Sequence, residues 1–258
     1  MQNLIESTHA APTAPVLGVI GGTSVYALSE LEAAQSRTLE TPFGAPSGPI
    51  RIGLIDSKCV AFLARHGESH ALPPHRVNYR ANLWALHALG VRRVLAINTV
   101  GGITEKAPPR ALIVPDQIID YTHGREATFW DGAGDMLHAE FADPYSHALR
   151  VALLEAGRQA GIALIDGGCY GATQGPRFET VAEIRRMRAD GCDVVGMTGM
   201  PEAALARELA LDYACIAPVA NWAAGCGDGA PITLDDVFAN LAACGGQLPA
   251  LLRSLLKG

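Results

Sequence analysis

Short apolar runs alternate along the chain with longer segments in which apolar residues recur at helical spacing. The apolar runs end in Gly, Pro or polar turns, which is typical of buried strands. They predict strands at 16–20, 50–55, 59–64, 94–98, 111–120, 163–172, 193–197 and 215–221. Helical spacing and capping residues predict helices at 76–90, 145–160, 180–190 and 201–210, and a last helix that opens at Thr233. The alternation predicts one α/β domain over 16–258, with a mostly parallel or mixed sheet, behind a loose tail at 1–15.

Composition narrows the class of protein. The chain has 258 residues, of which 49% are apolar and 18% charged, as in ordinary soluble enzymes and unlike disordered chains. No apolar run approaches the roughly 18 residues of a membrane helix, and the start lacks a secretion signal. The net charge of −6, without a block of like charges, argues against nucleic acid or an anionic membrane as partner. Six scattered cysteines without a C-x-x-C pair indicate free thiols in a reducing cytoplasm and no metal site.

Groups that suit an anion stand where predicted strands end. Gly21-Gly22-Thr23 follows the first strand, Arg65-His66 follows another, and Thr99 and Thr198 end two more. Strands of α/β sheets bind ligands at their carboxyl ends. Glycine-rich turns expose N–H groups, and Arg offers a planar fork of donors that suits phosphate oxygens. Each motif alone is also compatible with a plain turn or a surface ion pair, but together they predict one phosphate site.

Asn221 stands at the end of the apolar strand 215–221, where an amide is unexpected. A strand end is the right place for a ligand contact. A lone Asn is about as often found satisfying nearby loop backbone, so both interpretations are open at this point.

The motifs contain no nucleophile–base pair, no metal-ligand cluster and no pair of close carboxylates. This favours a mechanism in which the bound anion is itself the nucleophile.

Taken in order, these segments resemble the trimeric purine nucleoside phosphorylase and methylthioadenosine phosphorylase family. The resemblance runs from Val16 to Phe238 and rests on IGGT, TPFG, ARHG, H-x-x-x-P-x-x-V-N-Y, the N-x-x-GG turn, GPRFET and GMTGMPE. It implies a single α/β domain with a twisted mixed sheet, assembled as a homotrimer. The implied reaction is phosphorolysis of an N-glycosidic bond, with inorganic phosphate as co-substrate and no metal or organic cofactor.

The resemblance also implies roles for individual residues. Arg65, His66 and Asn221 are the expected catalytic residues. The other assignments place phosphate at Thr23, Arg65, His66, Thr99 and Thr198, the ribose at Met197, and the purine at Phe178, Glu179 and Asn221.

The two ends of the expected substrate site point to different branches of the family. Family members that act on 6-oxopurines resemble this chain in having Asn at position 221 and Glu after the purine-stacking Phe178, whereas adenine-specific members have a pair of Asp residues. At the other end, Leu234 and Val237 resemble the aliphatic 5′ pocket of methylthioadenosine phosphorylases, and His138 resembles a residue that enters the neighbouring subunit's pocket. The combination predicts 5′-methylthioinosine as substrate.

Three alternatives are open at this stage. A one-residue slip in the alignment at Leu234 would give an inosine or guanosine phosphorylase. Another carboxylate from the Gly-rich loop 223–231, such as Asp228, would favour a methylthioadenosine phosphorylase. A purine-binding regulatory protein is the non-enzymatic alternative, against which the phosphate-binding motifs argue.

Overall fold

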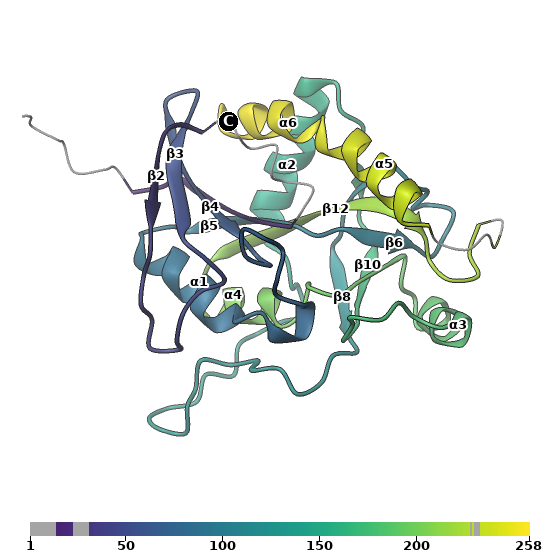
Figure 1. Ribbon diagram of the computed structural model, residues 1–258, viewed down its shortest axis with the longest axis horizontal. Helices are drawn as coiled ribbons and strands as arrows, with labels where there is room; N and C mark the ends of the chain where they lie inside the picture. Colours follow the sequence, from purple (N-terminus) through teal and green to yellow (C-terminus); the bar gives the residue numbers. More distant parts are fainter. Residues whose placement is uncertain (1–13, 23–30, 228, 230–232) are drawn as a thin grey trace, which may run out of the picture.

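The computed structural model describes residues 14–22, 31–227, 229 and 233–258. The expected N-terminal tail falls almost wholly outside these residues, and so does Thr23. Within them, a twisted sheet of twelve strands is flanked by helices (Figure 1), which confirms the predicted α/β fold with a mixed central sheet. None of the described helices is long and apolar enough to cross a membrane.

The strands run in the order β2-β3-β4-β1-β5-β12-β6-β11-β10-β8, and β7 pairs with both β12 and β9. Their bounds are β1 (Leu17–Gly21), β2 (Glu32–Arg37), β3 (Ile50–Ile55), β4 (Lys58–Ala64), β5 (Arg93–Ile97), β6 (Val100–Gly102), β7 (Leu112–Val114), β8 (Gln117–Asp120), β9 (Ile165–Asp166), β10 (Cys169–Ala172), β11 (Val194–Gly196) and β12 (Asp212–Trp222).

Helices cover both faces of the sheet. They are α1 (Tyr79–Ala88), α2 (His147–Ala160), α3 (Val181–Ala189), α4 (Glu202–Glu208), α5 (Leu234–Gly245) and α6 (Leu248–Leu255), with a 3₁₀ turn at Pro74–Arg76. Successive strand residues point to opposite faces. Leu95 of β5 therefore packs in the cluster with α2 and α6, whereas its neighbour Ala96 packs in the cluster with α1 and α4 (Figure 1). The central strands are buried on both sides, so they read as continuous apolar runs.

The long strand β12 joins the two halves of the sheet. Its first part, Asp212–Ile216, pairs in parallel with β5, and its last part, from Val219, pairs in parallel with β6. The register shifts between Val219 and Asn221, as at a β-bulge. A bulge bends a strand and re-aims the side chains that follow it. Asn221 thus stands one residue before the end of β12, close to where the sequence predicts the strand to end.

Capping residues delimit the helices much as predicted. Thr180 and Glu183 form a capping box at the start of α3, and the hydroxyl of Thr233 accepts the backbone N–H of Asp236 at the start of α5. Helix α2 ends at Gly161, whose φ of 69° is left-handed.

Several predicted elements are wrong in detail. The single strand expected at 111–120 is two strands, β7 and β8, that separate at Pro115-Asp116 and pair with different neighbours. The strand expected at 163–172 is interrupted at Gly167 and Gly168, both with positive φ. Proline cannot donate to a central ladder, and consecutive left-handed glycines break a strand's direction.

Three further elements differ from the sequence expectation. Val100–Gly102, expected to be part of an open backbone nest, is strand β6, which pairs with β11 and β12. The last helix is interrupted near Gly246 and continues as α6. Strand β2, whose residues are all exposed, has no apolar alternation and was not predicted.

Candidate active site

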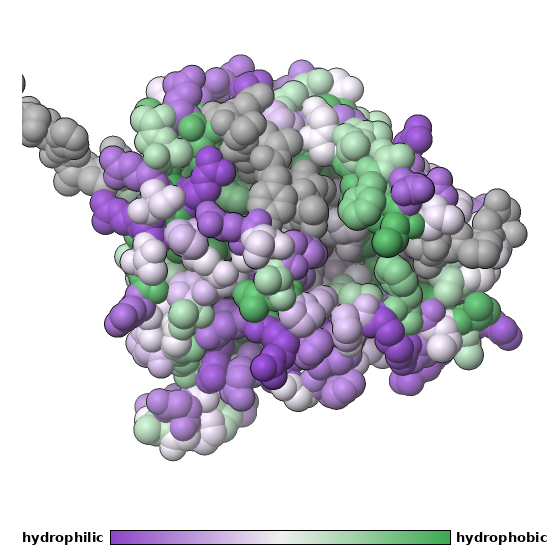
Figure 2. Space-filling model, viewed as in Figure 1, coloured by the Kyte–Doolittle hydropathy of each residue, from purple (hydrophilic) through white to green (hydrophobic). Residues whose placement is uncertain are grey.

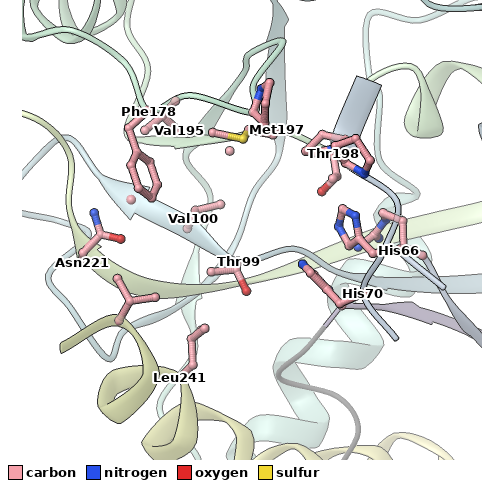
Figure 3. A pocket seen from close by; sticks show the side chains of 18 of the residues that line it. His66, His70, Thr99, Val100, Phe178, Val195, Met197, Thr198, Asn221 and Leu241 are labelled. Atoms are coloured by element: carbon pink, nitrogen blue, oxygen red, sulfur yellow. The ribbon is translucent and has the colours of Figure 1, made fainter. Parts of the chain in front are cut away.

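A cavity of about 510 Å³ opens where strand ends meet at the middle of the sheet. It is lined by ten of the residues singled out in the sequence: Arg65, His66, Thr99, Phe178, Glu179, Met197, Thr198, Asn221, Leu234 and Val237. His66, Thr99 and Thr198 lie around one end, and Phe178 and Asn221 lie at the other (Figure 3). His138 does not line the cavity and is exposed in the segment between β8 and α2.

Arg65 is buried, with 1% of its surface exposed, and its guanidinium is bound to the protein itself. Nε and Nη2 donate to the two carboxylate oxygens of Glu202 at 2.7 and 2.8 Å. Nη2 also donates to Asn98 Oδ1 at 2.7 Å and Nη1 to Ile97 O at 3.0 Å. Because Nη1 carries two hydrogens, one N–H remains for a ligand among the contacts of the described residues. The role of Arg65 in phosphate binding stays a prediction.

Glu202 is completely buried, so its charge must be balanced inside the protein. Tyr213 adds a third hydrogen bond, from its hydroxyl to Glu202 Oε1 at 2.9 Å. Burial by itself would lower the pKa of Arg65, but the charge of Glu202 and its hydrogen bonds raise that pKa overall. The pair is therefore charged on both sides and has no net charge. Arg65 cannot by itself give this end of the cavity a positive excess.

His66 presents an acceptor to the cavity. Its Nδ1 lies 2.8 Å from the carbonyl oxygen of Leu72, and since a carbonyl only accepts, Nδ1 carries the hydrogen. Burial and the charge of Arg65 lower the pKa of His66 to about 4, so the imidazole is neutral near pH 7. Its Nε2 then bears a lone pair. An acceptor at Nε2 suits a hydroxyl of the phosphate or of the sugar, and not an unprotonated phosphate oxygen.

Asn221 satisfies the backbone with one hydrogen and leaves its other groups available. Its Nδ2 donates to the carbonyl of Trp222 at 2.7 Å, and Oδ1 points toward the cavity (Figure 3). The amide nitrogen has a second hydrogen. A Cβ on Gly101 would lie 3.4 Å from Nδ2, so glycine leaves room beside the amide. Asn221 therefore fits both predictions in part: its Nδ2 binds a backbone carbonyl, and its side chain also lines the cavity.

Helix α5 gives the cavity an apolar wall. Leu234, Val237, Phe238 and Leu241 line it from one side. Leu234 and Phe238 are 63% and 58% exposed, and apolar side chains gather over α5 on the surface (Figure 2). Exposed apolar side chains around a cavity are typical of a ligand-binding surface.

Arg125 was not identified from the sequence, although it binds two loops beside the cavity. Its guanidinium donates to the carbonyl oxygens of Met197 and Met200, at 2.9 and 2.6 Å, and to those of Thr173 and Gln174, at 3.1 and 2.9 Å. Four carbonyls from two loops thus converge on one side chain. Arg125 lies in an irregular segment without periodicity, so no sequence signal marked it. Glu202 was also missed, because an acidic residue in a first helical turn needs no special explanation.

No group of three or more His, Cys, Asp or Glu side chains among the described residues could hold a metal ion. The cavity instead offers hydroxyls, the imidazoles of His66 and His70, the Asn221 amide and the Glu179 carboxylate. Such groups can bind and orient a polar ligand.

Comparisons with known proteins agree with this geometry. The family model described as Phosphorylase superfamily matches residues 16–257. The chain belongs to the phosphorylase superfamily. This confirms the family resemblance read from the sequence motifs.

Individual relatives of this superfamily are similar over most of their length. A protein of Xanthomonas campestris named probable S-methyl-5′-thioinosine phosphorylase is 59% identical over 243 residues, 94% of this chain and 97% of that protein. The 6-oxopurine nucleoside phosphorylase of Pyrococcus furiosus is 45% identical over 217 residues, 82% of this chain and 81% of that protein. Among solved structures, methylthioadenosine phosphorylase from Schistosoma mansoni in complex with adenine matches with a TM-score of 0.89 at 32% identity, covering 94% of this chain and 91% of that one.

We expect the buried ion pair to govern the stability of this phosphorylase-superfamily fold. Arg65→Met leaves the Glu202 carboxylate buried and unpaired, which costs about 3–5 kcal/mol of unfolding free energy. Arg65→Met combined with Glu202→Gln removes both charges and is expected to recover more than half of that loss. Urea unfolding of the single and double variants tests this.

Arg158→Met is the matched control, because Arg158 pairs with Glu155 on the exposed surface and the change should alter stability little. Additive effects of the two substitutions at Arg65 and Glu202 would contradict the coupling.

The neutral His66 predicts a loss of stability in acid. Its pKa is about 4 in the folded protein against an ordinary 6.5, so between these values the unfolded chain binds a proton that the folded protein does not. Stability is thus full above pH 6.5 and falls as the pH drops toward 4. His66→Asn should reduce the loss between pH 7 and 4.5 by about 2–3 kcal/mol. Unfolding free energies measured across this range test the prediction.

His147→Asn, at an exposed position, is the control and should follow the wild-type curve. Parallel curves for His66→Asn and wild type would contradict the proposed state of His66.

Proposed function

We propose that the protein cleaves 5′-methylthioinosine with phosphate, giving hypoxanthine and 5-methylthioribose 1-phosphate. The observation that carries this proposal is the contrast between two parts of the cavity lining. One part offers the Glu179 carboxylate and the Asn221 amide, and the other offers hydrocarbon side chains of α5. The chain's similarity to proteins named for methylthioinosine and for 6-oxopurine nucleosides supports the same substrate.

The base end suits a purine with a 6-oxo group. A 6-oxopurine carries a hydrogen on N1, and the Glu179 carboxylate only accepts hydrogen bonds. Adenine instead has a lone pair at N1, which a carboxylate repels. Asn221 donates its second hydrogen to O6 and accepts from N7–H through Oδ1. Phe178, which lines the same end, packs against the purine ring.

The apolar wall on α5 suits a methylthio group rather than a hydroxyl. Leu234 and Val237 provide an apolar surface against which a buried methylthio group gains about 1–2 kcal/mol. A 5′-hydroxyl buried there without a partner costs a similar amount. This difference separates methylthioinosine from inosine.

The reaction we propose proceeds without a nucleophilic side chain. The C–N bond stretches first, the sugar becomes oxocarbenium-like, and phosphate attacks C1′ from the face opposite the purine. Thr99, Thr198 and the remaining Nη1 hydrogen of Arg65 bind phosphate oxygens, and His66 accepts from a hydroxyl. Thr23, outside the described residues, keeps its proposed phosphate contact, and Met197 lies against the ribose.

The departing purine takes up at N7, by way of solvent, the proton that the attacking hydrogen phosphate gives up, and Asn221 Oδ1 accepts from that N7–H. Asn221 Nδ2 donates to O6, and this bond strengthens as negative charge develops on the purine. Phosphate is the co-substrate, and the proposed chemistry requires no metal or organic cofactor. The enzyme we propose works in the cytoplasm, in keeping with its free cysteine thiols.

A substrate panel tests the proposed reaction: methylthioinosine, methylthioadenosine, inosine, guanosine and adenosine, each with and without phosphate. Methylthioinosine is expected to have the highest kcat/KM, with cleavage only when phosphate is present. Asn221→Asp should lower kcat/KM for methylthioinosine about 10²-fold, since one transition-state hydrogen bond is lost, and should favour methylthioadenosine relative to it. An adenine or 5′-hydroxyl substrate ranked first would refute the substrate, and purine binding without cleavage would indicate a regulatory protein.

We also propose that the enzyme is a homotrimer in which His138 approaches the 5′ end of a neighbouring subunit's cavity. The segment between β8 and α2 extends away from the body of the protein (Figure 1) and exposes Trp130, Met136 and Leu137. Exposed apolar side chains on a projecting segment suit contact with another copy. Sedimentation should give a trimer, and a fully active monomer would contradict the assembly.

A further inference from the structure

The Glu179 carboxylate lies between two cavities. It lines the substrate cavity and also a second cavity of about 540 Å³ on the other side of the loop that follows β10. Thr173 and Arg177 line the second cavity and not the first. A side chain in this position can turn toward either space, so recognition of the purine requires something that fixes its direction.

Thr173 supplies that constraint. Its hydroxyl donates to Glu179 Oε1 at 2.7 Å, a short bond to a charged acceptor. The other acceptor near this hydroxyl, the carbonyl of Gly196, is farther away at 3.3 Å. No hydrogen bond to Glu179 Oε2 occurs among the described residues. Oε1 of Glu179 is thus bound by Thr173, and Oε2 is available to a ligand.

Thr173 is itself held firmly. It is only 8% exposed, and its N–H donates to Gly196 O at 2.8 Å. Its carbonyl accepts from Arg125 Nη2 at 3.1 Å. The hydroxyl therefore projects from backbone that is bonded on both sides, unlike a hydroxyl on a free loop.

Arg177 provides a competing position for the carboxylate. It lies two residues before Glu179, pairs with Glu183 on the surface, and lines the second cavity. If the Thr173 bond is lost, a carboxylate that turns into the second cavity faces this cation. Thr173 opposes this turn with a bond to Oε1.

We infer that Thr173 is a positioning residue for purine selection: by holding one oxygen of Glu179, it keeps the other facing the substrate cavity, where it accepts the N1–H of a 6-oxopurine. This inference rests on the proposed function. Thr173 does not touch the substrate and acts only through Glu179. Its loss should therefore lower activity on 6-oxopurines, leave phosphate binding nearly unchanged, and cause no loss for adenine nucleosides, whose N1 is then repelled less by the carboxylate.

Thr173→Val keeps the shape of the side chain and removes the hydroxyl, whereas Thr173→Ser keeps the hydroxyl and is the matched control. Thr173→Val is expected to lower kcat/KM for methylthioinosine about tenfold, the effect of one lost hydrogen bond to a charged group. The KM for phosphate should stay within about twofold, kcat/KM for methylthioadenosine should not fall, and Thr173→Ser should resemble wild type. Adding Arg177→Met to Thr173→Val should restore part of the methylthioinosine activity, because the competing charge is gone.

Equal losses for both nucleosides, or an unchanged ratio in a Thr173→Val protein with wild-type melting temperature, would overturn the inference. Calorimetric titration with hypoxanthine and adenine separates this failure from failure of the proposed reaction. If wild type does not cleave methylthioinosine, the proposed function fails. The role of Thr173 is then judged by whether the valine variant loses hypoxanthine affinity but not adenine affinity.

Discussion

The buried ion pair of Arg65 and Glu202 is the interaction on which the site depends. Arg65 follows β4 and bonds to the carbonyl oxygens of Ile20 in β1 and Ile97 in β5. Glu202 begins α4, and Tyr213 of β12 donates to it. One charge pair thus connects four adjacent strands to the helix beneath them. A buried pair of this kind is costly to break from one side, because the remaining charge has no water around it.

The same pair determines the electrostatics of the phosphate end. Glu202 offsets the charge of Arg65, and His66 is neutral, so these side chains provide directed hydrogen bonds without a net positive charge. In the proposed reaction, affinity for phosphate therefore comes from N–H and O–H groups such as those of Thr99 and Thr198. Such preorganised dipoles cost little reorganisation when charge moves during the reaction. Phosphate bound in the proposed way is also less strongly neutralised and remains a nucleophile.

Much of this site follows from local sequence, and the rest does not. The succession of strands along the chain and the polar groups at their ends are local features, because apolar runs and the residues that end them are contiguous. These polar groups include His66, Thr198 and Asn221. Glu202 and Arg125 act on residues far along the chain, and nothing near them in sequence signals those partners. The breaks at Pro115 and Gly167 have local causes, a proline and a pair of glycines, but the different partners of the strands on either side are set by the whole sheet. Composition limits the class of partner, but it gives no information about which donor meets which acceptor.

Two parts of the cavity lining, the apolar wall on α5 and the strand that carries Asn221, are joined by hydrogen bonds although their chemistry differs. The shift in register before Asn221 leaves the carbonyl of Ala220 to accept from Asn240 Nδ2 of α5 at 2.7 Å. Asn240 Oδ1 in turn accepts from Arg110 Nε at 2.8 Å. Helix α5, which carries the apolar wall, is thereby attached to the strand that carries Asn221.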